Sequence, residues 1–200
     1  WRVMQYALDD FEYFWVNGEL AGKLPPPSGV GPKGEWLNWG GAKTWPAPQG
    51  WDGPDQWPGP PDAVLDGSPH AAQVLTKTGE GVGVQLTSRP DRRSGIRFAR
   101  LVTLADNTTR VRMELTMTNV DNKPRRWGIW EVCQHNVANR SGEGYDPNVW
   151  AYIPLNRQSI FPDGYAVLFG IVNNPQFQVD RENGLMRVRY QRLVGKIGLD

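Results

Sequence analysis

The stretch TRVRMELTMTNVDNKPRRWGIWEVCQH, residues 109–135, decides the fold class of this chain. Its first half alternates apolar residues with charged and hydroxyl residues, the apolar set being Val111, Met113, Leu115 and Met117. A period of two residues predicts an antiparallel strand with one face in the core and one in water. The turn residues 121–124 then reverse the chain, and a second strand follows.

Outward from this hairpin, strand-like segments bounded by turn residues continue in both directions. They cover residues 1–8, 11–17, 71–88, 95–105, 149–154, 164–172, 177–184 and 185–193. No segment of ten or more residues shows a 3.6-residue period. About ten strands in one chain predict an all-β fold with few or no helices, a large antiparallel two-sheet sandwich. We expect residues 1–200 to form a single domain, truncated at one or both ends because Trp1 lies within an apparent strand.

Composition excludes several classes of partner and cofactor. The net charge is +1, from 22 basic and 21 acidic residues, which predicts neither a nucleic-acid nor an anionic-membrane partner. No apolar run approaches the ~20 residues that a membrane helix needs. One cysteine, Cys133, and two histidines without metal-binding spacing predict no metal or cofactor. The compartment (periplasmic, secreted or cytoplasmic) and the oligomeric state stay open.

The segment from Pro25 to Pro61 is unusually rich in two residue types. It holds five of the ten tryptophans and ten of the 17 prolines, with a spacing typical of neither helix nor strand. Sugars stack their C–H faces on aromatic rings and need fixed polar partners for their hydroxyls, so the segment predicts a sugar site. The candidate ligand-binding residues are Asn38, Lys43, Trp45, Trp51 and Trp57. The alternative is that these rings pack as a lid on the core.

The strand before His135 carries a second group of candidates. Alternation places Glu131 and His135 on one face and Gln134 on the other. Four residues separate Glu131 from His135, about 13 Å along a strand, so the two cannot pair directly. They are positioned to flank a pocket as general acid and base, and Gln134 is a candidate for sugar binding. The alternative is structural, with Glu131 bonded to a neighbouring strand and His135 exposed.

Two of these stretches together resemble a known family. WGGAKTWPAPQG, residues 39–50, resembles the Gly-Gly, three residues, Trp-Pro turn of galactose mutarotase-like proteins, especially their hexose-phosphate 1-epimerase branch. Residues 109–135 resemble the passage that leads to the catalytic histidine of that family. The chain is also similar to an uncharacterised bacterial family of mutarotase-like domains. The resemblance spans residues 36–170.

The resemblance implies a β-supersandwich that holds a sugar on the concave face of a large sheet. It further implies anomer interconversion without a cofactor, in which a histidine protonates the ring oxygen and a glutamate accepts the proton of the anomeric hydroxyl. His135 is the best match for the histidine, and Glu131 is the nearest carboxylate. The arginine of the epimerase branch is replaced by Trp39, with Lys43 as the neighbouring cation, and the C-terminal glutamate has no counterpart.

Three functions therefore remain open at the level of sequence. The first is a carbohydrate-recognising domain of mutarotase-like fold that binds a small-molecule sugar. The second is an active aldose or hexose-phosphate 1-epimerase, an isomerase that uses His135 and Glu131. The third is a structural sandwich domain of a larger carbohydrate-processing enzyme. Recognition ranks first because the second catalytic carboxylate is not found.

Overall fold

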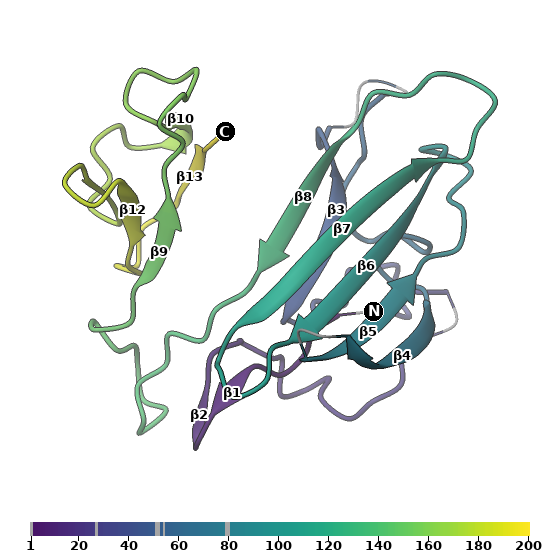
Figure 1. Ribbon diagram of the computed structural model, residues 1–200, viewed down its shortest axis with the longest axis horizontal. Helices are drawn as coiled ribbons and strands as arrows, with labels where there is room; N and C mark the ends of the chain where they lie inside the picture. Colours follow the sequence, from purple (N-terminus) through teal and green to yellow (C-terminus); the bar gives the residue numbers. More distant parts are fainter. Residues whose placement is uncertain (1, 27, 51–52, 54, 79–80) are drawn as a thin grey trace. The chain divides into compact units, whose positions relative to one another are not determined.

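The fold is all-β, as the sequence predicts, and each pair of named strands is antiparallel. The computed structural model describes all residues except 1, 27, 51–52, 54 and 79–80 (Figure 1). Strands make up 41% of the chain, and none of the described residues is helical. The fold divides into two compact units, Trp1–Asn136 and Val137–Asp200, called unit 1 and unit 2 below. The organisation of residues 1–200 as a single domain stays a prediction.

Unit 1 contains a four-stranded sheet in which each strand pairs with the next along the chain. Its strands are β4 (Ala71–Thr78), β5 (Gly81–Thr87), β6 (Ile96–Leu104) and β7 (Val111–Asn119). In β7 the side chains of Val111, Met113, Leu115 and Met117 are half-buried, whereas the residues between them are exposed. The alternation predicted for this strand is thus confirmed.

A second, two-stranded sheet of unit 1 pairs β3 (Ala42–Ala47) with β8 (Gly128–Cys133). The interpretation that the tryptophan- and proline-rich segment contains no strand is therefore wrong for β3. Ala42 exchanges backbone hydrogen bonds with Val3, so the N–H side of Ala42 faces away from β8. Two and four residues further on, Thr44 and Pro46 share that orientation. Pro46 consequently costs β3 no hydrogen bond to β8, which is why a strand tolerates proline here.

Side-chain bonds connect the four-stranded sheet of unit 1 to the β3–β8 pair. Leu65, Ile96 and Phe98 form the buried core, with Val64, Met117 and Trp127 packed around it. Arg100 of β6 reaches across, donating a hydrogen bond to the carbonyl of Ala42 in β3 at 3.0 Å. The N-terminal segment adds only two short paired strands, β1 (Ala7–Leu8) and β2 (Phe11–Glu12), instead of the two full strands predicted.

Unit 2 contains two small sheets. One has the order β11 (Phe177–Asp180), β12 (Leu185–Val188), β9 (Ala151–Pro154), and the other pairs β10 (Ala166–Gly170) with β13 (Gly195–Gly198). The turn between β11 and β12 contains Gly184 at a φ of 63°, a conformation that favours glycine. The sequence does not predict β13, because two of its four residues are glycine.

Candidate binding site

The paired strands β3 and β8 divide the predicted site residues between two faces. Thr44 lies opposite Glu131, whereas Lys43 and Trp45 lie opposite Val132 and Trp130. Because side chains alternate along a strand, Glu131 projects from one face of the pair. Lys43, Trp45 and Gln134 project from the other face. The predicted catalytic carboxylate and the predicted sugar-binding residues are therefore separated by the sheet itself.

Lys43 is the centre of the second face, and it is almost fully buried. Its Nζ donates hydrogen bonds to Asn38 Oδ1 at 3.2 Å and to Gln134 Oε1 at 3.0 Å. The same nitrogen lies 4.5 Å from the ring centre of Trp36 and 4.7 Å from that of Trp45. The structure thus brings together four residues predicted from sequence, and the two rings stabilise the ammonium by cation–π interaction.

The surroundings of Lys43 weaken its hold on a proton. The pKa of Lys43 is lowered from 10.5 to about 7, mainly by burial and secondarily by the positive charge of Arg2, while the negative charge of Asp66 opposes both. Removal from water disfavours the charged form of an amine, and two neutral amide oxygens replace that water only in part. Near neutral pH the buried amine is therefore present in both protonation states.

Asp66 organises the groups around Lys43. Its carboxylate accepts hydrogen bonds from Arg2 Nη2 at 2.7 Å, Trp45 Nε1 at 2.9 Å and Trp36 Nε1 at 2.9 Å. The side chains of Arg2 and Asp66 expose only 6% and 2% of their surface, so this is a buried ion pair. Sequence reasoning missed Arg2, Trp36 and Asp66. Asp66 was missed because an aspartate followed by a glycine, here Gly67, is typical of an ordinary turn.

A pocket of about 280 Å³ lies beside this ion pair. Its lining includes Arg2, Met4, Lys23, Trp39, Asp66 and Ser68. The indole N–H of Trp39 donates no hydrogen bond to any other described residue and remains available as a donor. The pocket therefore combines an aromatic ring, a free donor and a fixed pair of opposite charges.

Glu131, on the opposite face, connects the β3–β8 pair to the four-stranded sheet of unit 1. Its Oε2 accepts a hydrogen bond from Thr44 Oγ1 at 2.6 Å, and its Oε1 pairs with Arg100, which is completely buried. Burial raises the pKa of Glu131, and the favourable interactions with Arg100 and Thr44 oppose that rise. Both carboxylate oxygens are thus engaged by neighbouring strands, which matches the structural alternative for this residue.

His135 lies beyond the end of β8 and is exposed. Its backbone forms an isolated bridge with Phe14, and the centres of the two rings are 6.1 Å apart. It lines neither of the two cavities of unit 1 described here. The structure does not bring His135 and Lys43 into one pocket.

Two of the predicted tryptophans of the proline-rich segment, Trp45 and Trp57, lie inside unit 1. Trp45 is 6% exposed and Trp57 1% exposed, and their ring centres are 5.1 Å apart. The indole N–H of Trp57 donates to Asp62 Oδ2 at 2.8 Å. These two rings therefore pack in the core, with their polar edges satisfied by carboxylates. Trp51 lies outside the described residues.

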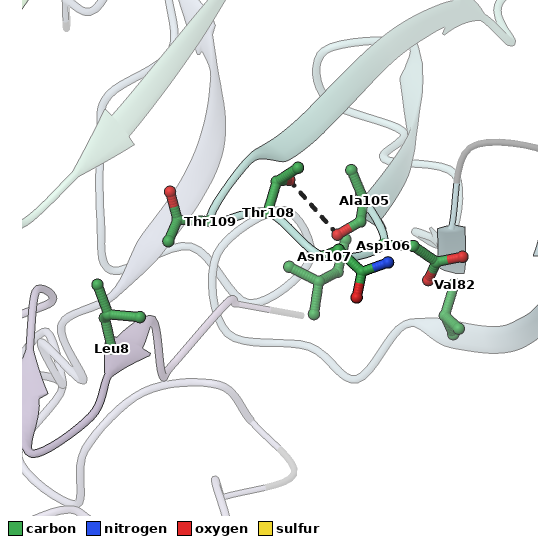
Figure 2. A pocket seen from close by; sticks show the side chains of 8 residues that line it. Leu8, Val82, Ala105, Asp106, Asn107, Thr108 and Thr109 are labelled. Atoms are coloured by element: carbon green, nitrogen blue, oxygen red, sulfur yellow. Dashed lines mark hydrogen bonds between the residues drawn. The ribbon is translucent and has the colours of Figure 1, made fainter.

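A second cavity of unit 1, of about 460 Å³, contains none of the predicted site residues. Figure 2 shows its lining around the β6–β7 turn, residues 105–109, together with Leu8 of β1 and Val82 of β5. Within the turn, Thr108 Oγ1 donates to the carbonyl of Ala105 at 3.5 Å. Apart from Asp106 the lining carries no ionisable group, so the smaller pocket beside Asp66 is the better candidate site.

Comparison with protein-family models, curated proteins and solved structures finds no match to the chain. Among the described residues, no group of three or more histidine, cysteine, aspartate or glutamate side chains is arranged to hold a metal ion. The same residues include no helix that is both long and apolar enough to cross a membrane.

Proposed function

We propose that this chain is a carbohydrate-recognising domain that binds a single sugar ring in the pocket beside Arg2 and Asp66. The observation that carries the proposal is the combination, on one pocket of about 280 Å³, of the Trp39 indole with a buried, fixed ion pair. Its volume lies just below the range of about 300–1,000 Å³ for drug-sized ligands, which suits a single small ring. The resemblance to mutarotase-like proteins points to the same ligand class.

The pocket offers the kinds of contact that a sugar requires. The Trp39 ring provides a surface for C–H groups, and its free N–H provides a donor for a hydroxyl oxygen. A carboxylate has about four acceptor positions, and Asp66 uses three of them for Arg2, Trp36 and Trp45. The fourth is available to a hydroxyl. Because these partners are already held in place, little conformational entropy is lost on binding.

Titration of the chain with a panel of neutral mono- and disaccharides, followed by tryptophan fluorescence and calorimetry, tests the proposal. We expect one sugar to bind, and Trp39→Ala to weaken its affinity at least tenfold, about 1.4 kcal/mol. Trp15→Ala is the matched control, because Trp15 is an exposed tryptophan that does not line the pocket. Equal affinity in the Trp39→Ala variant, or no binding by any sugar, rejects the proposal.

The epimerase alternative is less well supported. Glu131 is bonded to Arg100 and Thr44 on the opposite face of β3–β8 from Lys43, and His135 lines no described pocket. A general acid and a general base must both reach the same substrate. The sugar that binds should therefore show the same rate of anomer exchange, measured by NMR, with and without the protein.

The third function, a structural domain of a larger enzyme, has one observation in its favour. Unit 2 exposes several large apolar side chains, among them Ile160 at 80%, Val172 at 75% and Val194 at 75%. Exposed apolar groups of this kind often mark contact surfaces. The sugar titration separates the two functions, because a purely structural domain binds no sugar.

A further inference from the structure

Unit 2 carries a group of arginines stacked on aromatic rings. Trp150 precedes β9, and Arg187 and Arg189 lie two residues apart on and just after β12, which pairs with β9. The guanidinium carbons of Arg187 and Arg189 lie 4.6 Å and 4.5 Å from the Trp150 ring centre. Two cations thus share one indole, and the ring fixes the position of both.

A third arginine extends this group. The guanidinium carbon of Arg192 lies 5.4 Å from the ring centre of Tyr145, and that ring contacts Tyr190 edge to face at 5.4 Å. Tyr190 and Arg192 are exposed, and Arg187, Arg189 and Tyr145 are half-buried. These three arginines and three rings of unit 2, none of them fully buried, are here called the arginine–aromatic surface.

The positive charge of this surface is not balanced by ion pairs. Arg187, Arg189 and Arg192 form no salt bridge with any described carboxylate. The pKa of Asp180 is lowered mainly by hydrogen bonds from Asn183 and to a smaller extent by the charge of Arg187, and its oxygens bond to Asn183. Asp163 pairs with Arg181. Asp163 and Asp180 are thus bonded to residues outside the three arginines.

Among the described residues, the hydrogen-bond acceptor that these guanidinium groups meet is a neutral amide. With its amide oxygen turned toward Arg189, Gln191 accepts hydrogen bonds from Nε at 3.2 Å and Nη2 at 2.8 Å. Arg187 Nε is buried and donates to no described residue. That buried nitrogen is out of reach of a ligand, but a guanidinium offers five donors in a planar fork that matches a carboxylate. The donors on the two Nη atoms of Arg187 bond to no described residue and are the ones left for an acidic ligand.

We propose that the arginine–aromatic surface binds the carboxylate groups of an acidic saccharide, such as a uronic-acid oligosaccharide. The choice of a saccharide rests on the function proposed above, and the choice of a carboxylate rests on the three arginines. A single-stranded nucleic acid is the less suitable ligand, because its bases need free aromatic faces. The rings of Trp150 and Tyr145 already contact guanidinium groups, and the chain as a whole has a net charge of only +1.

Binding of an oligogalacturonate to the full chain, measured by calorimetry at low salt, tests this inference. We expect binding that weakens with added salt and is lost when the carboxylates are methyl-esterified. Arg187→Gln should weaken it roughly 10- to 100-fold, the range for charge-assisted hydrogen bonds. Arg187→Lys keeps the charge but not the fork and should still weaken it about tenfold. Circular dichroism checks that both variants are folded.

Arg181→Gln is the matched control, because Arg181 is an exposed arginine of the same unit that pairs with Asp163 and contacts no described ring. It should bind within twofold of the unchanged chain. The inference is overturned if Arg187→Gln binds oligogalacturonate normally, if the methyl ester binds equally well, or if an oligo-thymidine strand binds as tightly.

The two proposals fail in different ways. If Trp39→Ala leaves neutral-sugar binding unchanged while Arg187→Gln removes oligogalacturonate binding, the pocket of unit 1 is wrong and the arginine–aromatic surface stands. If neutral sugars bind through Trp39 but oligogalacturonate does not bind, the reverse holds.

Discussion

Lys43 places an amine in the interior of unit 1, between two indole rings and two amide oxygens. A buried charge of this kind is retained only where its surroundings replace most of its hydration. Asn38, Gln134 and the rings of Trp36 and Trp45 do so in part, since the pKa of Lys43 still falls to about 7. The stability of the fold should therefore depend on pH through this one residue.

The sign of that dependence follows from the two pKa values. Between pH 7 and pH 10.5 the unfolded chain holds the Lys43 proton and the folded chain has largely released it. Folding stability contributed by this group therefore rises with pH across that window, by up to about 1.4 kcal/mol per pH unit. In urea unfolding at pH 7, 8, 9 and 10, Lys43→Met should lose this rise.

Lys33→Met provides the comparison, because Lys33 is an exposed lysine of the same unit. Its free energy of unfolding should follow the pH profile of the unchanged chain. A Lys43→Met profile parallel to both would mean that the amine keeps an ordinary pKa in the fold.

At the scale of elements, the two faces of the β3–β8 pair have different roles. We expect Glu131 on one face to affect the stability of the fold and not the binding of sugar. Glu131 connects this pair to β6 through the buried Arg100, on the face away from Lys43. Glu131→Gln leaves that guanidinium without its counter-charge and should lower the free energy of unfolding by about 3 kcal/mol. The affinity of the folded protein for its sugar should stay within twofold. Urea unfolding and sugar titration of the same preparation measure both, and a large loss of affinity would place Glu131 in the site.

The same elements show how much of the fold could be predicted from the sequence. The alternation in β7 is strict, and its half-buried and exposed residues follow the prediction one by one. The opposite orientations of Glu131 and Gln134 were also predictable, because they need only the period of a strand. β3 was not, since its β-structure depends on the partner strand β8, 87 residues away between Thr44 and Glu131.

The candidate site, too, could be predicted from the sequence only in part. Asn38, Lys43, Trp45 and Gln134 meet as a group, although the sequence could not show that the group is buried. The outward or inward orientation of a tryptophan depends on which carboxylate accepts its N–H. For Trp45 that carboxylate is Asp66, 21 residues away, and no local pattern identifies it.

At the scale of the whole chain, the division into two units predicts that unit 1 folds and binds its sugar without unit 2. The pocket and every partner of Lys43 and Asp66 described above lie within residues 1–136. A fragment of residues 1–136 should therefore unfold cooperatively in urea and bind the sugar with the affinity of the full chain. Residues 1–119 make a matched control, because they lack β8 and the partner of β3. Loss of binding in the longer fragment would show that the site needs unit 2.

Pro46 has a consequence for the behaviour of the chain among its own copies. The outer edge of β3 is bonded to Val3 at Ala42, and Pro46 leaves that edge without a backbone donor two residues past Thr44. Pro46 is also fully buried, so both burial and the missing donor close this edge. Edges with such a gap resist the lateral addition of strands that begins aggregation. A further strand therefore cannot pair regularly with the outer edge of β3, and Pro46 contributes to this limit on the size of the sheet.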